Sequence, residues 1–100
     1  MSKVANKKLF KEKLKPLLDS IGFKNSQKSV FFRLDLYRIQ LQDIYERNYG
    51  SYRCYTLFLM DNGNIILLFK TYYIDTFIEY LKIEFNSRIR KYKIEKLLNG

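Results

Sequence analysis

The dipeptide Asn62–Gly63, which separates two runs rich in apolar and aromatic residues, restricts what this chain can fold into more than any other feature. Both residues tolerate a positive φ, and a type I′ turn requires a positive φ at its two central positions. The flanking runs, residues 52–60 and 65–71, have the length and composition of strands. The sequence therefore predicts a β-hairpin over residues 52–71.

This predicted hairpin has apolar side chains on both of its faces. A two-residue turn sets Met60 opposite Ile65, and counting along the strands sets Thr56 opposite Phe69. A soluble antiparallel sheet usually needs to cover only one face, so the second apolar face requires a cover of its own. Two covers are compatible with the sequence: helices from both ends of the chain, or a partner molecule.

Alternating side chains predict two more strands upstream of this hairpin. Residues 29–35 place Phe32 on one side and Arg33 on the other, and residues 38–45 place Arg38 on the outward side. A turn near positions 36 and 37 joins the two strands. These strands and the hairpin make four in all.

Helices are predicted at both ends of the chain. Over residues 6–21 the apolar residues recur at the spacing of one helical stripe. An interruption is expected at Pro16, because proline lacks the N–H that a helix interior uses, and Gly22 is placed to end the helix. Residues 72–98 return to helical spacing, as a second amphipathic helix followed by a basic helical tail.

Together these patterns predict a single α+β domain over residues 1–100, in the order α-β-β-β-β-α(-α), with four antiparallel strands over residues 29–71 and helices packed on the sheet. A content of 47% hydrophobic and 17% aromatic residues excludes a disordered chain. A mean hydropathy of −0.32 without a long apolar run argues against a spanning helix. With one cysteine and no recognisable secretory segment, the cytoplasm is the expected compartment.

The side chains on which most catalytic and metal sites depend are scarce in this sequence. Because the chain has no histidine, Cys54 lacks the usual base partner and is interpreted as a buried, unreactive thiol. The candidate carboxylate pairs, Asp35 with Asp43 and Asp75 with Glu79, have no recognisable acid/base or metal-binding context. We therefore predict a protein that is not an enzyme and has no cofactor and no metal ligands.

The formal net charge of +9 is concentrated at the two ends of the chain. Residues 1–28 hold eight lysines against two acids, and residues 87–100 hold five basic residues against one acid. If both ends fold to one side, they form one electropositive field that attracts polyanions. The candidate contact residues are Lys8, Lys11, Lys15, Arg88, Arg90, Lys91 and Lys93. The alternative is a solvated helix surface with i, i+4 ion pairs, which Lys8–Glu12, Lys15–Asp19 and Glu84–Arg88 have the spacing to form.

Aromatic and basic residues also alternate around a turn at Gly50. The candidate binding residues of this segment are Tyr45, Arg47, Tyr49, Tyr52 and Arg53. Tyrosine rings can stack on unpaired bases while arginines contact phosphates, a combination that single-strand binders use. The alternative is that the tyrosines cover the edge of the sheet and keep their hydroxyl groups in water. Tyrosine and arginine are also favoured anchors of protein interfaces.

A set of short motifs runs through the first part of the chain: Phe10, Leu14, Lys15, Pro16, Leu17, Gly22, Phe23, Lys24, Phe32, Arg33, Ile39, Gln40, Leu41, Gln42, Tyr49, Gly50 and Ser51. These motifs resemble a family of small bacterial α+β domains of unknown function, over about residues 8 to 60. The resemblance implies a fold and no activity. In general character, a small lysine-rich chain is also similar to phage or mobile-element proteins that block host machinery.

The function predicted from these features is binding without catalysis. The first hypothesis is a basic protein that engages nucleic acid or a nucleoprotein complex through its basic ends and residues 45–55, as a phage or mobile-element inhibitor would. The second is a protein-interaction module, such as an immunity-type protein, an inhibitor or a homodimer, that uses the apolar face of the 52–71 hairpin. No membrane partner is expected, because the core is the simpler use for the apolar stripes of the terminal helices.

Overall fold

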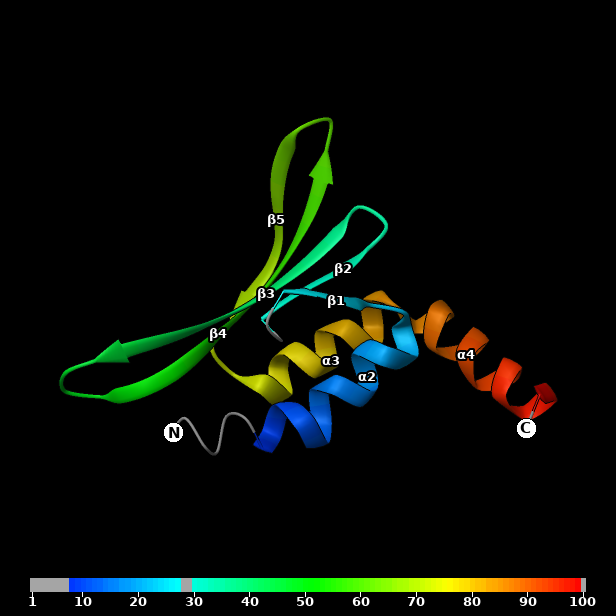
Figure 1. Ribbon diagram of the computed structural model, residues 1–100, viewed down its shortest axis with the longest axis horizontal. Helices are drawn as coiled ribbons and strands as arrows, with labels where there is room; N and C mark the ends of the chain where they lie inside the picture. Colours follow the sequence, from blue (N-terminus) through cyan, green and yellow to red (C-terminus); the bar gives the residue numbers. More distant parts are fainter. Residues whose placement is uncertain (1–7, 28–29, 100) are drawn as a thin grey trace.

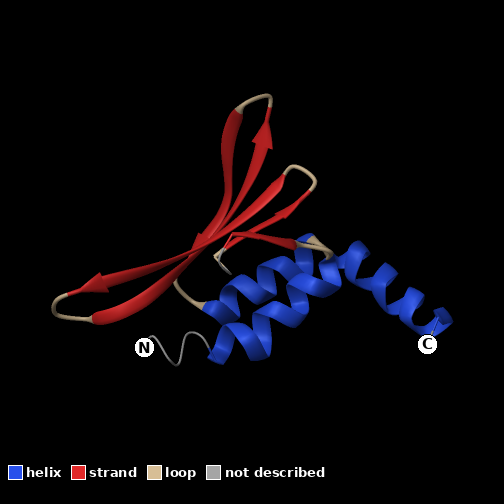
Figure 2. Ribbon diagram, viewed as in Figure 1, coloured by secondary structure: helices blue, strands red, loops and turns tan. Residues whose placement is uncertain are grey.

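The computed structural model describes residues 8–27 and 30–99 and has the predicted α+β architecture. The described residues form an antiparallel sheet in the order β1-β2-β3-β4-β5, with the strands β1 (Lys24–Gln27), β2 (Phe31–Leu34), β3 (Tyr37–Glu46), β4 (Gly50–Asp61) and β5 (Asn64–Thr71). The helical elements are a π-helical segment, η1 (Phe10–Leu14), and the helices α2 (Lys15–Ile21), α3 (Ile74–Glu84) and α4 (Asn86–Asn99). The sheet is strongly twisted, α2 and α3 lie along one side of it, and α4 extends away from the body (Figure 1, Figure 2). None of the described helices is long and apolar enough to cross a membrane.

The first helix changes its geometry just before Pro16. The N–H of Lys15 donates to the carbonyl of Phe10, five residues back, and the regular helix α2 begins with Pro16 in its first turn. Because proline has no N–H, one α-helical hydrogen bond cannot form there, and the wider π-helical turn precedes it. The predicted interruption is confirmed. The start predicted at residue 6 lies outside the described residues.

Gly22 ends this helix as the sequence predicts. Its φ of 111° lies in the region that favours glycine, and the N–H groups of Gly22 and Phe23 both donate to the carbonyl of Leu18. The ring of Phe23 then meets Phe85 edge-on, with 5.5 Å between the ring centroids. This cap therefore turns the chain from the helix into β1 and joins the N-terminal helix to the end of α3.

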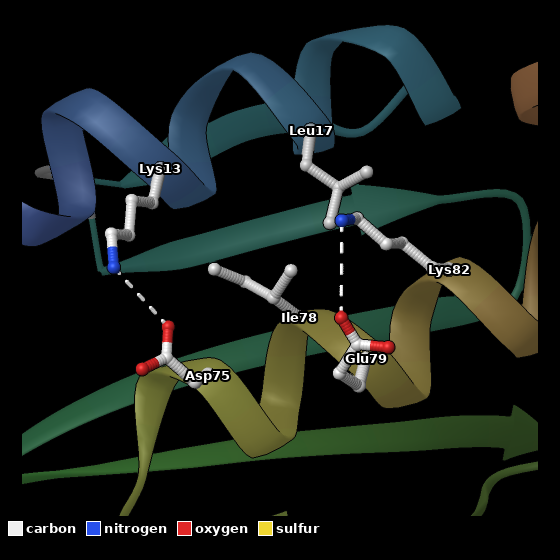
Figure 3. Close-up of a pocket in the computed structure, with 6 residues that line it drawn as sticks. All are labelled: Lys13, Leu17, Asp75, Ile78, Glu79 and Lys82. Carbon is white, nitrogen blue, oxygen red and sulfur yellow. Dashed lines mark hydrogen bonds and ion pairs between the residues drawn. The ribbon is translucent and has the colours of Figure 1, made fainter.

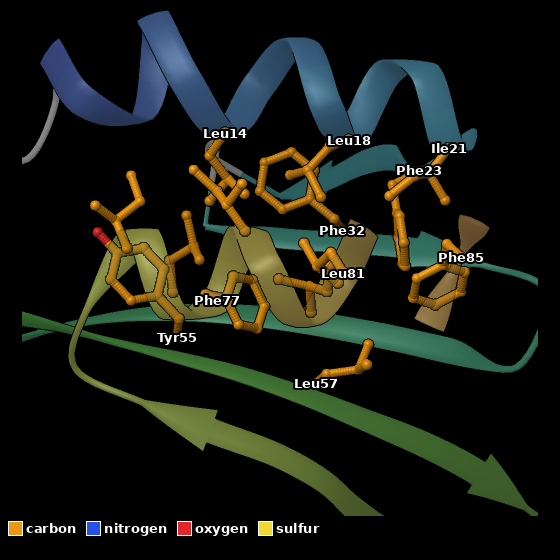
Figure 4. Close-up of a cluster of buried hydrophobic side chains, with 14 residues drawn as sticks. Leu14, Leu18, Ile21, Phe23, Phe32, Tyr55, Leu57, Phe77, Leu81 and Phe85 are labelled. Atoms are coloured by element: carbon orange, nitrogen blue, oxygen red, sulfur yellow. The ribbon is translucent and has the colours of Figure 1, made fainter. Parts of the chain in front are cut away.

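The core fills the space between one face of the sheet and the helices (Figure 4). Side chains that are almost completely buried come from the first helix, from the sheet and from α3: Leu14, Leu18, Phe32, Ile39, Leu57, Phe77 and Leu81. Only the helix side of the sheet contributes to this cluster. No helix within residues 8–27 and 30–99 covers the other side, which we call the open face.

The turn of the β4–β5 hairpin is confirmed. Asn62 and Gly63 have φ values of 49° and 84°, and Met60 faces Ile65 across the strands. Positive φ at both central positions is what a type I′ turn requires.

The register predicted farther from this turn is wrong. A β-bulge, seen as a shift of register at Leu57 and Phe58, makes Phe69 face Leu57 and not Thr56. An extra residue in one strand turns the following side chains to the opposite face. Phe69 therefore points to the helix side, where its ring stacks on that of Tyr80 with 4.1 Å between the centroids.

The sheet has one strand more than the sequence predicts. The strand β1 pairs with β2, and Lys24 faces Arg33 across the two strands. The residues of β1 are all polar, so they show no alternation from which a strand could be inferred. The turn between β2 and β3 falls at Asp35 and Leu36, one residue earlier than predicted.

Candidate functional site

Within residues 8–27 and 30–99, the basic residues of the two ends do not converge on one side of the molecule. The first helix begins at one end of the helical layer, and α4 extends beyond the other end, in a molecule 50 Å long (Figure 1). It is α2, the later part of the first helix, that contacts α4. The described cations of the two ends therefore do not form a single electropositive field.

Two of the four candidate cations of the tail, Arg88 and Lys91, lie at the junction of α2 and α4. Arg88 donates to the carboxylate of Asp35 at 2.8 Å and does not form the predicted pair with Glu84. Arg88 and Lys91 line a hollow of about 260 Å³ that also contains the carboxylates of Asp19 and Glu95. The remaining candidates are dispersed: Lys93 lines a second hollow with Lys82 and Tyr92, and Arg90 is exposed.

The candidate lysines of the first helix also remain apart from one another. Lys15 forms the predicted i, i+4 ion pair with Asp19. Lys8 and Lys11 are exposed, and the predicted pair between Lys8 and Glu12 is absent from the ion pairs of the described chain. Two of these three lysines are therefore free to meet solvent, at the far end from α4.

The candidate residues around Gly50 separate into exposed and buried groups. Tyr45 and Tyr49 are 74% and 79% exposed at the tip of the β3–β4 hairpin, and Arg47 is exposed beside them. Arg53 is only 7% exposed, and its guanidinium donates to both carboxylate oxygens of Asp43, at 2.8 and 3.2 Å. Arg53 therefore has a structural role, because its positive charge is already paired with the carboxylate of Asp43.

Tyr52 makes a strong local hydrogen bond in the same hairpin. Its hydroxyl donates to Glu46 at 2.6 Å, and its ring meets Tyr72 edge-on with 5.4 Å between the centroids. The hydrogen bond to the Glu46 carboxylate raises the pKa of Tyr52 from 10.0 to about 12, because ionisation would remove the donor and place two anions together. The neutral phenol is therefore the form that the folded hairpin favours.

The Glu46→Gln variant is expected to lower the pKa of Tyr52 toward 10. In the wild type, the raised pKa stabilises the fold at every pH below about 10, where an unfolded tyrosine is neutral, and this contribution is lost as the pH rises toward 12. Alkaline titration followed by phenolate absorbance measures the shift as a difference between variant and wild type. Glu12→Gln, on the first helix, is the control and leaves the titration unchanged. If both variants titrate like the wild type, the hydrogen bond does not hold the phenol.

One hollow lies between the first helix and α3 (Figure 3), with a volume of about 430 Å³. Its charged groups neutralise one another: Lys13 lies 3.4 Å from Asp75, and Lys82 lies 3.9 Å from Glu79. These four residues are all exposed, and Leu17 is one of the apolar residues between them. Because Lys13 and Lys82 are each paired with a carboxylate, neither lysine is an unpaired charge that would attract a ligand to this hollow.

The open face of the sheet carries a row of cations that sequence analysis did not identify. Lys24 faces Arg33, Arg33 faces Arg38, and the row continues across β4 and β5 to Phe58 and Leu67. Residues directly opposite on neighbouring antiparallel strands share a face, with Cβ atoms roughly 5 Å apart. We call Lys24, Arg33 and Arg38 the basic row.

No carboxylate compensates the basic row on its own face. Apart from the β3–β4 hairpin tip, which holds Glu46, the outward positions of the described sheet are Lys24, Gln27, Phe31, Arg33, Arg38, Gln40, Gln42, Cys54, Thr56, Phe58, Met60, Ile65, Leu67 and Lys70. Arg38 donates to the backbone carbonyls of Asp35 and Tyr37, both at 2.8 Å, so its positive charge is not neutralised by an acid. Like charges directly opposite one another destabilise a sheet, and an anion bound on this face would relieve the repulsion.

Two aromatic rings lie beside the basic row on the open face. Phe31 and Phe58 are both half-buried, and each is therefore only partly covered by its neighbours. Phe31 faces Gln40 in the adjacent row, which continues through Thr56 to the exposed Lys70. The open face thus combines partly exposed aromatic rings with cations.

The lone cysteine is buried on β4. The Sγ atom of Cys54 lies 3.7 Å from the hydroxyl of Thr56. In residues 8–27 and 30–99, no group of three or more potential metal-ligating side chains comes together. The prediction that the chain is not an enzyme stays a prediction.

Comparison with known proteins gives no match from which a function could be inferred. No family model matches it, and neither the curated proteins nor the solved structures contain a significant match. The resemblance to small bacterial α+β domains therefore remains a prediction from its motifs.

Proposed function

We propose that this protein binds single-stranded nucleic acid, alone or within a nucleoprotein complex, across the open face of its sheet. The observation that carries the proposal is the basic row, in which Lys24, Arg33 and Arg38 lie opposite one another without a carboxylate beside them. A structural role would favour alternating charges at these positions. A phosphate backbone supplies consecutive anions, and contacts with such cations dominate affinity for nucleic acids.

The rings of Phe31 and Phe58 favour a single strand over a duplex. Half-buried rings among cations offer flat surfaces on which unpaired bases stack, and such stacking tolerates any base. In a duplex the bases already stack on one another, so these rings would have nothing to contact. The proposed ligand is therefore single-stranded DNA or RNA of no particular sequence.

The proposed partner belongs to the class predicted from the sequence, but the residues proposed to bind it are different. The exposed tip residues Tyr45 and Tyr49 and the tail cations lie outside the open face and are not required. The proposed role is binding and involves no catalytic step. Inhibition of host machinery, as by a phage or mobile-element protein, stays a prediction.

The Arg33→Ala/Arg38→Ala variant is expected to weaken binding and to reduce its salt dependence. Each phosphate contact with a single strand contributes about 0.7 to the slope of log K against log salt, so the loss of two contacts lowers the slope by about 1.4. The measurement is fluorescence anisotropy with labelled single-stranded DNA and RNA over a series of salt concentrations. Circular dichroism verifies that the variant is folded.

The matched control is Lys13→Ala/Lys82→Ala, which removes the same charge from the helical side of the molecule. Both of these lysines already have carboxylate partners, so the affinity is expected to remain within about twofold of the wild type. If the wild type shows no binding at about 50 mM salt, or if the control variant loses as much affinity as the arginine variant, the open face is not the binding site.

A further inference from the structure

The strand β5 is an edge strand with exposed apolar side chains. Among the described residues it pairs with β4 and with no strand on its other side. Ile65, Ile66 and Leu67 are 68%, 41% and 57% exposed. Proteins usually protect such an edge with a charge, a proline or a bulge. The bulge and Lys70 lie in the second half of β5, so the first half has no such protection.

The hydrogen-bonding groups on this free edge can be assigned from the turn. The two-residue turn makes Asp61 and Asn64 the closing hydrogen-bonded pair, and bonded and non-bonded pairs alternate along an antiparallel ladder. Ile66 therefore bonds to β4, whereas Ile65 and Leu67 direct their backbone N–H and C=O groups away from it. These two residues present the groups with which another strand would pair.

We propose that β5 pairs with β5 of a second copy of this chain, antiparallel, about a twofold axis at Ile66. In this register Ile65 of each copy faces Leu67 of the other as a hydrogen-bonded pair, and the two Ile66 side chains meet on the helix side. Lys70 comes opposite the turn residue Asn62 of the other copy and meets no cation. Each of the three exposed apolar residues thus gains an apolar partner.

The distribution of charge favours a second copy over an unrelated acidic partner. Two chains of net charge +9 repel one another wherever their cations meet. Residues 54–69 contain no lysine or arginine, and Asp61 is their one acid, so two copies can approach along this hairpin without opposed cations. An acidic partner would be drawn to the basic parts of the molecule, not to this neutral edge.

The shape of the molecule leaves room for this pairing. The tip of the β4–β5 hairpin stands clear of the helical layer (Figure 1), and the 41% exposure of Ile66 shows that no described helix covers the inner side there. The twofold axis is perpendicular to the sheet, so both copies keep their helices on the same side. The two open faces then form one continuous surface.

Light scattering coupled to size exclusion tests the pairing without any ligand. The wild type is expected to have twice the mass of the 12.2 kDa chain, also at high salt, because apolar and backbone contacts are weakly screened. Leu67→Lys is expected to be a folded monomer, since an edge lysine opposes strand pairing. Ile83→Lys, which adds the same charge at an exposed position of α3, is expected to stay dimeric.

Oxidative crosslinking tests the register. Ile66→Cys is expected to form a disulfide-linked dimer across the axis, because Cα atoms of a non-hydrogen-bonded pair lie roughly 4.5 Å apart, within the range that a disulfide bridges. Ile65→Cys is expected to crosslink poorly, since its counterpart lies two residues away.

The inference is overturned by a monomeric wild type, by a Leu67→Lys variant that remains dimeric, or by efficient crosslinking at position 65 without crosslinking at 66. A dimer that dissociates at high salt together with co-purified nucleic acid also overturns it, because that dimer is bridged by the ligand. The proposed nucleic-acid function can fail or succeed independently, since a monomer retains the basic row.

Discussion

Replacing Phe77 with alanine is expected to lower the free energy of unfolding by about 3–5 kcal/mol. Phe77 is fully buried in α3, and its ring stacks on those of Tyr55 and Phe69, with centroid distances of 5.5 and 6.4 Å. Removing the ring leaves a cavity that the surrounding side chains of the sheet and the helices fill only in part. A domain of this size has a total stability of about 5–15 kcal/mol, so the substitution removes a large part of it.

Urea unfolding followed by circular dichroism measures this loss. The matched control is Ile83→Ala on the same helix, where the side chain is 77% exposed and truncation is expected to change the stability by less than about 0.5 kcal/mol. Equal unfolding midpoints for the two variants would show that α3 does not bury the face that carries Phe77.

Replacing Asp43 with alanine is expected to destabilise the protein by about 2–3 kcal/mol. The substitution leaves the guanidinium of Arg53, which is 7% exposed, without the carboxylate that accepts its two hydrogen bonds. A buried charge that loses its partner retains the cost of desolvation and loses the compensating attraction. The more exposed position of Asp43 keeps the expected effect below that of a fully buried pair.

A double variant separates the cost of leaving the Arg53 charge unpaired from the cost of losing the ion pair itself. Asp43→Ala/Arg53→Met removes the unpaired charge as well, and it is expected to recover most of the stability that Asp43→Ala loses. Asp19→Ala is the control, since it breaks the exposed ion pair with Lys15 and is expected to cost at most about 0.5 kcal/mol. If Asp43→Ala is no more destabilising than Asp19→Ala in urea unfolding, the Asp43–Arg53 pair does not stabilise the hairpin.

The features predicted correctly from the sequence are those that neighbouring residues decide. The positive φ values at Asn62 and Gly63 follow from the turn that these residues favour, and Gly22 ends its helix for the same steric reason. The interruption at Pro16 follows from a missing N–H. In each case the cause lies within one turn of the chain, so no tertiary information is needed.

The features that sequence analysis missed depend on pairing between distant segments. The polar strand β1 has no periodicity of its own and exists because β2 offers it an edge. The bulge that turns Phe69 toward Tyr80 lies where the sheet and α3 must fit together. The aromatic neighbours of Arg53 along the chain predict a binding residue, whereas its partner Asp43 lies on the opposite strand.

The candidate site shows the same division. Alternation within β2 makes Arg33 point away from the buried Phe32, and alternation within β3 places Arg38 on the outward side. The sequence therefore specifies the direction of both arginines. That they face one another and Lys24, with no carboxylate beside them, follows from the register of three strands. Local sterics and periodicity are encoded along the chain and can be read there. The neighbours of a charge are set by long-range packing, and therefore the separation of the basic ends and the assembly of the basic row emerge only when the sheet and helices come together.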